Sequence, residues 1–384
     1  MTSSPASLYV HIPFCERKCL YCDFSSVEGT EGAEHFLAAL GCEISLRGET
    51  ADRAAFETIF LGGGTPSLLE PDQIEAILSR LRTVFRIGTD AEVTLEANPG
   101  TVTGETLRAF RSLGINRLSV GIQSFHDPEL KALGRIHDRG EALRCLELAR
   151  GAGFDNVGID LIYSIPGQTL AQWEDSLRTA VALAPQHIAA YNLIVEEGTP
   201  LAGMVRCGRV RLNAADLEAE MYERTMGFLG AHGYEHYEVS NYALPGFRCR
   251  HNWAYWSHQD YLGLGPSAHS FRREDSGASA RRWWNVGDLS TYGDRLNAGI
   301  LPVESEEALG ARELLGERIL LGLRTGALDV RRLSLDFGDD FNSRQSDVMQ
   351  WMIEERVALS EQGMLRLTPK GFLLCDEIIS RLLR

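Results

Sequence analysis

The sequence predicts an α/β protein: a partial barrel of six β/α units, followed by a C-terminal helical unit that resembles a winged helix. Three observations support this fold. Short apolar runs alternate with helical patterns about six times before residue 200, as in parallel β/α folds. Six units are fewer than the eight that close a TIM barrel, so we expect the barrel to be open. After about residue 303, helical patterns dominate.

Six segments are predicted to be strands, because each is short, rich in β-branched or aromatic residues, and followed by turn residues. These segments are 7–14, 58–67, 92–100, 117–125, 156–166 and 187–200. The helices between them are predicted from apolar residues spaced three and four positions apart. They cover residues 33–47, 72–85, 103–113, 139–152 and 169–184.

The composition changes after the barrel. Residues 214–232 are predicted to form one long helix, 234–271 are rich in aromatic side chains, and 272–282 are predicted to form a polar loop. The C-terminal part predicts a helix, a short strand over MLRL, a turn over TPKG and a last helix. We expect this part to pack as a cap on the barrel. The predicted domains are a barrel over 1–235, an extension over 236–302 and a C-terminal unit over 303–384.

Charge and composition exclude several classes of protein. The formal net charge of −15 argues against broad nucleic-acid binding, which depends on neutralising phosphates. The chain has no apolar run long enough to span a bilayer, and its N-terminus lacks the pattern of a secretory signal. We therefore expect a cytoplasmic protein whose eight cysteines are thiols.

Three of these cysteines are clustered. Cys15, Cys19 and Cys22 lie in YVHIPFCERKCLYCDF, in a polar loop after the first strand. Structural zinc usually takes four ligands from two C-x₂-C pairs, and the chain has no second pair. Iron–sulfur clusters normally take four thiolates, so three would leave one iron open to a ligand. The isolated cysteines are predicted to be small buried hydrophobic residues. They are Cys42, Cys145, Cys207, Cys249 and Cys375.

The C-x₃-C-x₂-C spacing, with the aromatic Tyr21 before its last cysteine, resembles the radical S-adenosylmethionine (SAM) superfamily. The resemblance implies that Cys15, Cys19 and Cys22 hold a [4Fe-4S] cluster. It also implies that the fourth iron binds the amino and carboxylate groups of SAM.

Polar residues at the ends of later strands fit this interpretation, because β/α folds place their chemistry at those ends. Two carboxylates, an amide and a guanidinium suit the ribose hydroxyls, ammonium and carboxylate of SAM. By default, each of them could be a solvated loop residue. The resemblance implies the SAM contacts Tyr9, Tyr21, Gly63, Gly64, Thr65, Glu96, Gln123, Arg135 and Asp160.

The whole chain resembles the coproporphyrinogen dehydrogenase-like branch of this superfamily. The motifs FLGGGTPSLL, LEANPGT, GIQSF, LGRIH, DLIYSIPGQ and HNWAYW occur in the expected order. The dehydrogenases carry a fourth cysteine two residues after the third, where this chain has Phe24. The sequence is therefore more similar to the HemW family of heme chaperones. The alternatives are an oxygen-independent coproporphyrinogen III dehydrogenase, which uses SAM-derived radicals, and a radical SAM enzyme with another substrate.

Heme binding would need an axial ligand, an apolar wall and cations for the propionates. His251 in HNWAYW is the predicted ligand, and His269 is a second candidate. The alternative for His251 is a hydrogen-bonded histidine in an aromatic core, and His11 is expected to be structural. The possible propionate partners are Arg248, Arg250, Arg272, Arg273, Arg281 and Arg282.

The resemblance implies that heme is passed to acceptor hemoproteins, with respiratory proteins at the membrane as the expected class. Docking at the membrane would be peripheral or through a partner. The cluster and SAM can gate dimerisation or heme release without redox turnover, so the chaperone function does not require an enzyme. A homodimer is compatible with this function.

Overall fold

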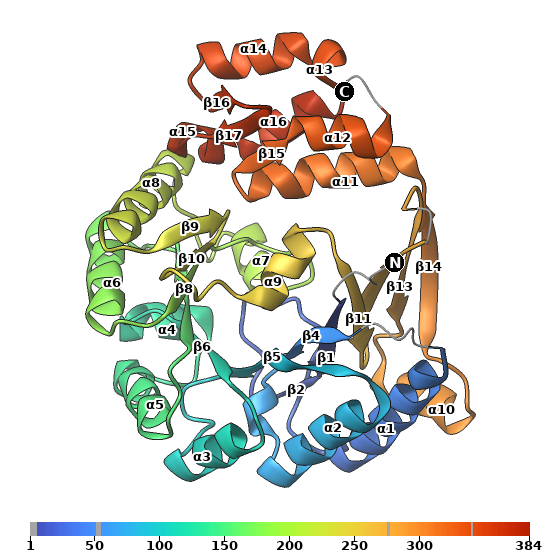
Figure 1. Ribbon diagram of the computed structural model, residues 1–384. Helices are drawn as coiled ribbons and strands as arrows, with labels where there is room; N and C mark the ends of the chain where they lie inside the picture. Colours follow the sequence, from blue (N-terminus) through green and yellow to red (C-terminus); the bar gives the residue numbers. More distant parts are fainter. Residues whose placement is uncertain (1–5, 51–54, 275–276, 339–340) are drawn as a thin grey trace.

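The computed structural model describes residues 6–50, 55–274, 277–338 and 341–384. Residues 1–5 lie outside these ranges. They belong to the N-terminal segment for which the sequence predicts no secretory signal. A twelve-stranded sheet runs through the molecule in the order β14-β13-β12-β11-β1-β4-β5-β6-β7-β8-β10-β9. Helices cover its outer face, and the C-terminal unit lies across one side of the barrel (Figure 1).

Six parallel strands in chain order form the middle of this sheet, which confirms the predicted partial barrel. They are β1 (Ala6–Ile12), β4 (Phe56–Gly63), β5 (Ile87–Ala97), β6 (Arg117–Gln123), β7 (Val157–Tyr163) and β8 (His187–Asn192). Almost every residue of β1 and β6 is buried, as expected for strands of a parallel sheet that are covered on both faces.

The outer helices follow the predicted pattern and include one short helix that the sequence did not predict. They are α1 (Ala33–Thr50), α2 (Pro71–Val84), α3 (Gly104–Ser112), α4 (Asp127–Leu133), α5 (Arg139–Gly151) and α6 (Leu170–Ala182). The unpredicted helix is α4. Thr103, Asp138 and Thr169 cap α3, α5 and α6 by accepting a backbone N–H of the first turn, which explains where these helices begin.

The extension adds strands to the β1 edge of the sheet. β11 (Asp260–Leu264) runs parallel to β1, and β12 (His269–Arg273), β13 (Ala280–Asn285) and β14 (Val303–Leu309) continue the sheet as antiparallel strands. The prediction of a loop over 272–282 is therefore wrong at both ends, which belong to β12 and β13. Residues 275–276 of this segment lie outside the described part. Its polar residues are compatible with strands because Arg282 pairs with acidic side chains on β14 and on the C-terminal unit.

The opposite edge ends in two short strands. β10 (Asn241–Ala243) pairs with β8, and β9 (Glu235–Glu238) pairs with β10, both antiparallel. The remaining elements of the barrel and extension are β2 (Phe14–Cys15), β3 (Val27–Glu28), η1 (Pro66–Leu68), α7 (Pro200–Arg206), α8 (Ala215–Ala231), α9 (Arg250–Trp256) and α10 (Leu289–Asn297). α9 lies between the two edges of the open barrel (Figure 1).

A buried polar cluster fastens the extension to the barrel. The carboxylate of Glu43 on α1 is fully buried and accepts hydrogen bonds from Gly265 N at 2.8 Å, Tyr292 Oη at 2.7 Å and Asn285 Nδ2 at 2.7 Å. Arg47, one turn later, lies 3.8 Å from the same carboxylate. We call these five residues the Glu43 cluster.

The C-terminal unit has its own apolar core. Its elements are α11 (Ala311–Arg324), β15 (Ala327–Asp329), α12 (Val330–Phe337), α13 (Phe341–Arg344), α14 (Ser346–Glu354), β16 (Ala358–Glu361), β17 (Met364–Leu367), α15 (Pro369–Leu373) and α16 (Cys375–Leu382). Helices surround a three-stranded antiparallel sheet, which agrees with the predicted helical, winged-helix-like unit. β14 belongs to the main sheet, although the predicted third domain begins at residue 303.

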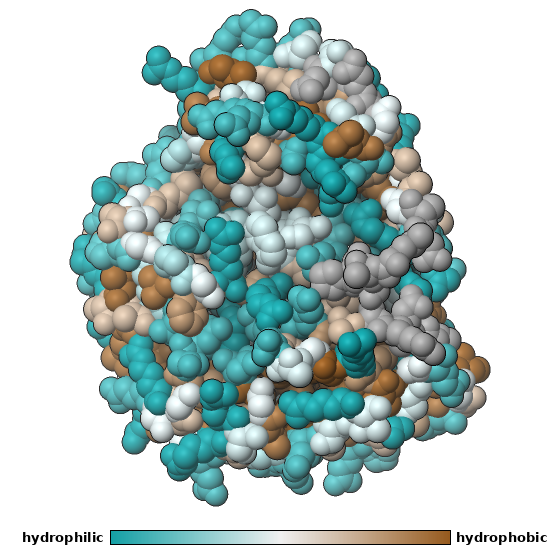
Figure 2. Space-filling model, in the orientation of Figure 1, coloured by the Kyte–Doolittle hydropathy of each residue, from teal (hydrophilic) through white to brown (hydrophobic). Residues whose placement is uncertain are grey.

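In the part of the chain that the structure describes, no helix has the length and apolar character needed to cross a bilayer. The face shown in Figure 2 is mainly hydrophilic, and its hydrophobic residues are scattered. Cys42 and Cys207 are exposed, so their prediction as buried hydrophobic residues is wrong. Cys145, Cys249 and Cys375 are buried as predicted.

Candidate functional site

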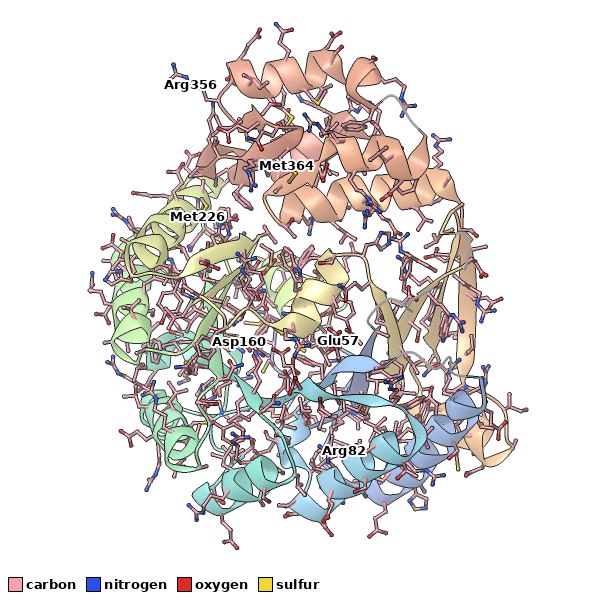
Figure 3. The ribbon with its side chains drawn as sticks, in the orientation of Figure 1. Glu57, Arg82, Asp160, Met226, Arg356 and Met364 are labelled. Carbon is pink, nitrogen blue, oxygen red and sulfur yellow. The ribbon has the colours of Figure 1, made fainter. Side chains whose placement is uncertain are left out.

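The predicted site residues meet at the carboxyl ends of the parallel strands. All three clustered cysteines, and every predicted SAM contact except Tyr9, line one cavity of about 340 Å³, which we call the SAM cavity. Parallel strands bring their carboxyl ends to one edge of the sheet, and for this reason residues 145 positions apart in the chain, from Cys15 to Asp160, reach the same space. Figure 3 shows Asp160 among the side chains at the centre of the barrel.

Backbone hydrogen bonds hold the cysteine loop in place. Cys15 ends the short strand β2, and its carbonyl oxygen accepts the N–H of Gly29 at 2.8 Å. The N–H of Leu20 donates to Leu133 O at 3.1 Å, and Leu20 O accepts the N–H of Leu201 at 2.9 Å. The loop that bears the thiols is therefore tied to α4 and to α7.

The glycine segment at the end of β4, residues 62–64, packs directly against this loop. Gly63 has a φ of 109°, a conformation that glycine adopts without strain. A Cβ atom on Gly64 would lie 2.5 Å from the carbonyl oxygen of Phe14, so a larger residue would push the segment and the loop apart. The N–H of Thr65 donates to Phe14 O at 2.7 Å, and Thr65 Oγ1 lies 3.7 Å from Cys15 Sγ.

Two half-buried carboxyl groups, Glu96 and Asp160, form the acidic side of the SAM cavity. Burial, and next the nearby Asp160, raise the pKa of Glu96 to about 8. Burial also raises the pKa of Asp160 to about 6, although Arg117 and Ser119 oppose the shift. The N–H of Gly63 donates to Glu96 Oε2 at 3.1 Å. A cationic ligand would favour the ionised forms of both groups.

Arg135 connects the cluster loop to the barrel strands. Its guanidinium lies 3.4 Å from Cys19 Sγ and donates to Gly121 O at 2.7 Å and to Asn98 Oδ1. Asn98 Nδ2 donates in turn to Thr65 Oγ1 at 2.9 Å. Arg135 thus joins one cysteine of the loop to β6 and to the segment that follows β5.

The donor set fits an iron–sulfur cluster. All eight cysteines are free thiols. Within the described ranges, no three His, Cys, Asp or Glu side chains lie close enough together to hold a single metal ion. The three thiols of the loop instead surround a cavity, and this arrangement suits a ligand group larger than one zinc ion.

Sequence reasoning missed several lining residues. Ser119 and Gly121 line the SAM cavity together with Gln123, because alternate residues of a strand share one face. The same two-residue spacing relates Asn98 to Glu96. Tyr191 and Asn192 also line the cavity, and their place at the end of the sixth strand is the signal that could have identified them.

Tyr9 points elsewhere. It lines a second cavity of about 180 Å³ inside the barrel, which we call the polar chamber. The Tyr9 hydroxyl lies 3.1 Å from Nδ1 of the buried His11, whose Nε2 lies 2.7 Å from Ser25 O. Both ring nitrogens of His11 therefore have protein partners, as expected of a structural histidine. The chamber is lined by Tyr9, Phe60, Glu96, Arg117, Ser119, Asp160, His187, Tyr191, Asn241, His251, Asn252 and Tyr255.

His251 is buried, and both of its ring nitrogens have partners. Nδ1 lies 2.7 Å from Thr58 Oγ1, and Nε2 lies 2.8 Å from Tyr255 Oη. Burial, and next Arg117, lower the pKa of His251 to about 3. The structure therefore favours the alternative considered for this residue, a hydrogen-bonded histidine in an aromatic core. His269 is exposed on β12, where it stacks against Trp284.

Most of the arginines proposed for heme propionates already face acidic partners. Arg248 lies 3.0 Å from Glu235, Arg250 lies 3.3 Å from Glu57, and Arg281 lies 3.5 Å from Glu306. Arg282 donates to both oxygens of Glu317 on α11 at 2.8 Å. The structure thus uses these cations to join strands and domains.

Comparisons with known proteins agree with this geometry. The model of the Radical SAM superfamily matches residues 9–180. The heme chaperone HemW of Bacillus subtilis (strain 168) is 34% identical over 98% of this chain and 99% of its own length. The heme chaperone HemW of Mycobacterium tuberculosis (strain H37Rv) is 35% identical over 100% of this chain and 96% of its own length.

A solved structure shows the same fold. Coproporphyrinogen III oxidase (HemN) from Escherichia coli, described as a radical SAM enzyme, superposes with a TM-score of 0.84 at 24% identity. The match covers 100% of this chain and 91% of that chain. Both the barrel and the C-terminal unit therefore belong to one shared architecture.

Proposed function

The chain belongs to the HemW family of radical SAM proteins, and from this membership we propose that it binds heme and delivers it to acceptor hemoproteins. Its relatives over nearly the whole length are named heme chaperones. The alternative is the dehydrogenase chemistry of the fold relative, a coproporphyrinogen oxidase.

The residue at position 24 is the observation that favours the heme chaperone over the dehydrogenase. The dehydrogenases that the sequence resembles have a fourth cysteine at this position, whereas here the side chain is that of Phe24. This side chain lines the SAM cavity and is 60% exposed. A phenyl ring supplies no thiol for cluster or substrate chemistry, and its exposure at the cavity leaves it free to contact an apolar ligand.

As a radical SAM protein the chain takes a [4Fe-4S] cluster and SAM, and we propose which residues hold them. Cys15, Cys19 and Cys22 would ligate the cluster, which supplies an open iron for the amino and carboxylate groups of SAM. The glycine segment would line the methionine part, and Glu96 would accept hydrogen bonds from its ammonium or hydroxyl groups. The other proposed SAM contacts are Tyr21, Gly63, Gly64, Thr65, Gln123, Arg135 and Asp160.

Several finer points belong to the proposal. The heme acceptors would be respiratory hemoproteins, reached by peripheral contact with the membrane or with a partner. The site of action would be the cytoplasm, and the working form would be a homodimer. The three predicted domains would divide the tasks: the barrel would hold the cofactors, and the C-terminal unit would cap the barrel.

The test is a hemin titration of the protein after anaerobic reconstitution of its cluster. The wild type is expected to bind hemin stoichiometrically and, in a parallel reaction with coproporphyrinogen, SAM and a reductant, to form no decarboxylated product. Cys19→Ser should lose most of the iron–sulfur absorbance, whereas Cys207→Ser, which alters an exposed thiol elsewhere, should keep it.

Decarboxylated product, or failure of the wild type to bind hemin, would contradict the chaperone function. Formation of 5′-deoxyadenosine together with a modified small molecule would instead identify a radical SAM enzyme with another substrate. Retention of the full absorbance in Cys19→Ser would show that the cluster is not assigned correctly to the loop.

A further inference from the structure

A third cavity lies between the barrel and the C-terminal unit. Its volume is about 460 Å³, and we call it the interdomain cavity. Tyr191, Tyr255 and Trp256 supply aromatic walls from the barrel side, and Leu321 and Arg324 supply the wall from α11. The other lining residues are Glu238, Val239, Ser240, Asn241 and Asn252. Lining residues of the two sides lie on α9 and α11, which neighbour each other in Figure 1.

The interdomain cavity and the polar chamber share part of their walls. Tyr191, Asn241, Asn252 and Tyr255 line both spaces. The chamber therefore lies directly behind the interdomain cavity, on the side of the barrel interior. The four shared side chains form the boundary between the two spaces.

Arg117, at the start of β6, is the unusual residue of the chamber. Its side chain is 1% exposed. In the described part of the chain, no hydrogen bond or ion pair reaches its guanidinium, and its Nε is a buried nitrogen without a partner. Nδ1 of His187 and Oδ1 of Asn241, which line the same chamber, are also buried without partners.

Among the described residues, the nearby carboxyl groups do not accept hydrogen bonds from the Arg117 guanidinium. Glu92 contributes to the charge balance of Arg117, but its oxygens accept the backbone N–H groups of Arg250 and His251 at 3.2 and 3.1 Å. Asp160 accepts from Ser119 at 3.3 Å. A buried guanidinium without hydrogen bonds is costly, so its donors are available to an acceptor inside the chamber.

We propose that the interdomain cavity holds the heme ring and that the polar chamber receives one heme propionate, which pairs with Arg117. This inference rests on the proposed function and adds a place for the ligand. The occupant has the matching chemistry, because heme combines a flat apolar ring with two carboxylates on short arms. The interdomain cavity, at about 460 Å³, lies within the size range of ligand pockets, about 300–1,000 Å³.

The contrast with the other arginines supports this choice. Arg248, Arg250 and Arg282 are partly exposed and face acidic partners, so a propionate would have to displace those partners. Arg117 has no hydrogen-bond partner to displace among the described residues. Its planar fork can also donate two parallel hydrogen bonds to one carboxylate.

The experiment compares two ligands that differ only at the carboxylates: zinc protoporphyrin IX and its dimethyl ester. Both are titrated by fluorescence into the wild type, Arg117→Gln and the matched control Arg178→Gln, whose side chain is 55% exposed on α6. Arg117→Gln should lower the affinity for zinc protoporphyrin IX about ten- to a hundredfold. The affinity for the dimethyl ester, which is lower in the wild type, should stay unchanged. Arg178→Gln should change neither.

A second pair of variants tests the outer cavity and does not depend on the folding of Arg117→Gln. Leu321→Trp should fill the interdomain cavity and lower the affinity for both porphyrins. Leu359→Trp, at a position 54% exposed on β16, should weaken neither. Circular dichroism and SAM binding confirm that each variant is folded.

The outcomes separate this inference from the proposed function. Tight binding of zinc protoporphyrin to the wild type with unchanged affinity in Arg117→Gln and Leu321→Trp would overturn the location and leave the chaperone function intact. Equal affinity of the wild type for the acid and the ester would show that no porphyrin carboxylate pairs with Arg117. If the wild type binds neither zinc protoporphyrin nor hemin, the proposed function itself fails.

Discussion

Two buried charged groups of this molecule, the Glu43 carboxylate and the Arg117 guanidinium, differ in their hydrogen bonding. In the Glu43 cluster, the carboxylate accepts three hydrogen bonds and lies near a cation on its own helix. In the polar chamber, Arg117 has no hydrogen bond within the described residues, and His187 and Asn241 each keep an unpartnered atom. Both regions are deep in the protein, so burial alone does not distinguish them.

The difference indicates what each region does. A buried polar group whose bonds are all made within the protein stabilises one arrangement of the chain. A buried group that keeps unused donors lowers stability until a ligand or water satisfies it, and proteins retain such groups at functional sites. We therefore interpret the Glu43 cluster as structural and the chamber as part of a binding site.

The largest expected effect tests the structural side of this comparison. Glu43→Ala would leave the donors of Tyr292, Asn285 and Gly265 without their acceptor, and we expect a loss of about 3–5 kcal/mol in the free energy of unfolding. Urea denaturation measures it. Glu34→Ala, an exposed change on the same helix, is the control and should cost less than about 0.5 kcal/mol. A loss below about 1 kcal/mol for Glu43→Ala would end the distinction between the two regions.

His251 lines the chamber but is fully hydrogen bonded, so it should behave like the Glu43 cluster. His251→Ala removes two hydrogen bonds and opens a cavity, and we expect a loss of about 2–4 kcal/mol in unfolding free energy with hemin affinity retained. The exposed His269→Ala is the control. A large drop in hemin affinity without a loss of stability would restore His251 as the axial ligand.

Glu96 provides a test by pH. Its ordinary pKa of 4.5 is raised to about 8 in the folded protein, so the unfolded chain releases this proton first as pH rises. Without SAM, the free energy of unfolding should therefore fall between about pH 4.5 and 8, by at most about 1.4 kcal/mol per pH unit for this group. SAM affinity should rise over the same range, because the cationic ligand favours the carboxylate.

Urea denaturation at several pH values, with and without SAM, measures both slopes. Glu96→Gln should flatten the fall in stability and the rise in SAM affinity. Glu105→Gln, an exposed change on α3, should alter neither. Equal slopes in the wild type and Glu96→Gln would show that Glu96 ionises as it does in the unfolded chain.

The smallest effect on the free energy of unfolding is expected at Arg117, the chamber residue whose charged group has no hydrogen bond within the described residues. Arg117→Met keeps the apolar stem of the side chain and removes a charge that makes no hydrogen bond within the described residues but faces Glu92 and Asp160, so the loss in the free energy of unfolding should be about 1–2 kcal/mol, smaller than that of Glu43→Ala. Urea denaturation without ligand gives this number beside that of Glu43→Ala. A loss above about 3 kcal/mol would place Arg117 among the structural residues and remove the contrast.

Much of the fold, and the gathering of the proposed SAM contacts in one cavity, could be predicted from the sequence because the signals are local. Each strand of the barrel is a short apolar run, and each helix has its own spacing and cap, so the order of six β/α units follows from the chain. The spacing of Cys15, Cys19 and Cys22 is likewise local. Glu96, Gln123 and Asp160 can be expected to lie together because parallel strands bring their carboxyl ends to a single edge of the sheet.

Only the tertiary structure decided the rest, because those features depend on partners far away in the chain. The polar residues of β12 and β13 form strands because the main sheet and α11 offer them neighbours. Tyr9 faces the chamber, and His251 is bonded to Thr58, 193 positions away in the chain. The isolation of Arg117 is likewise invisible in RLSVGIQSF, since a missing partner can be recognised only when everything around a side chain is in place.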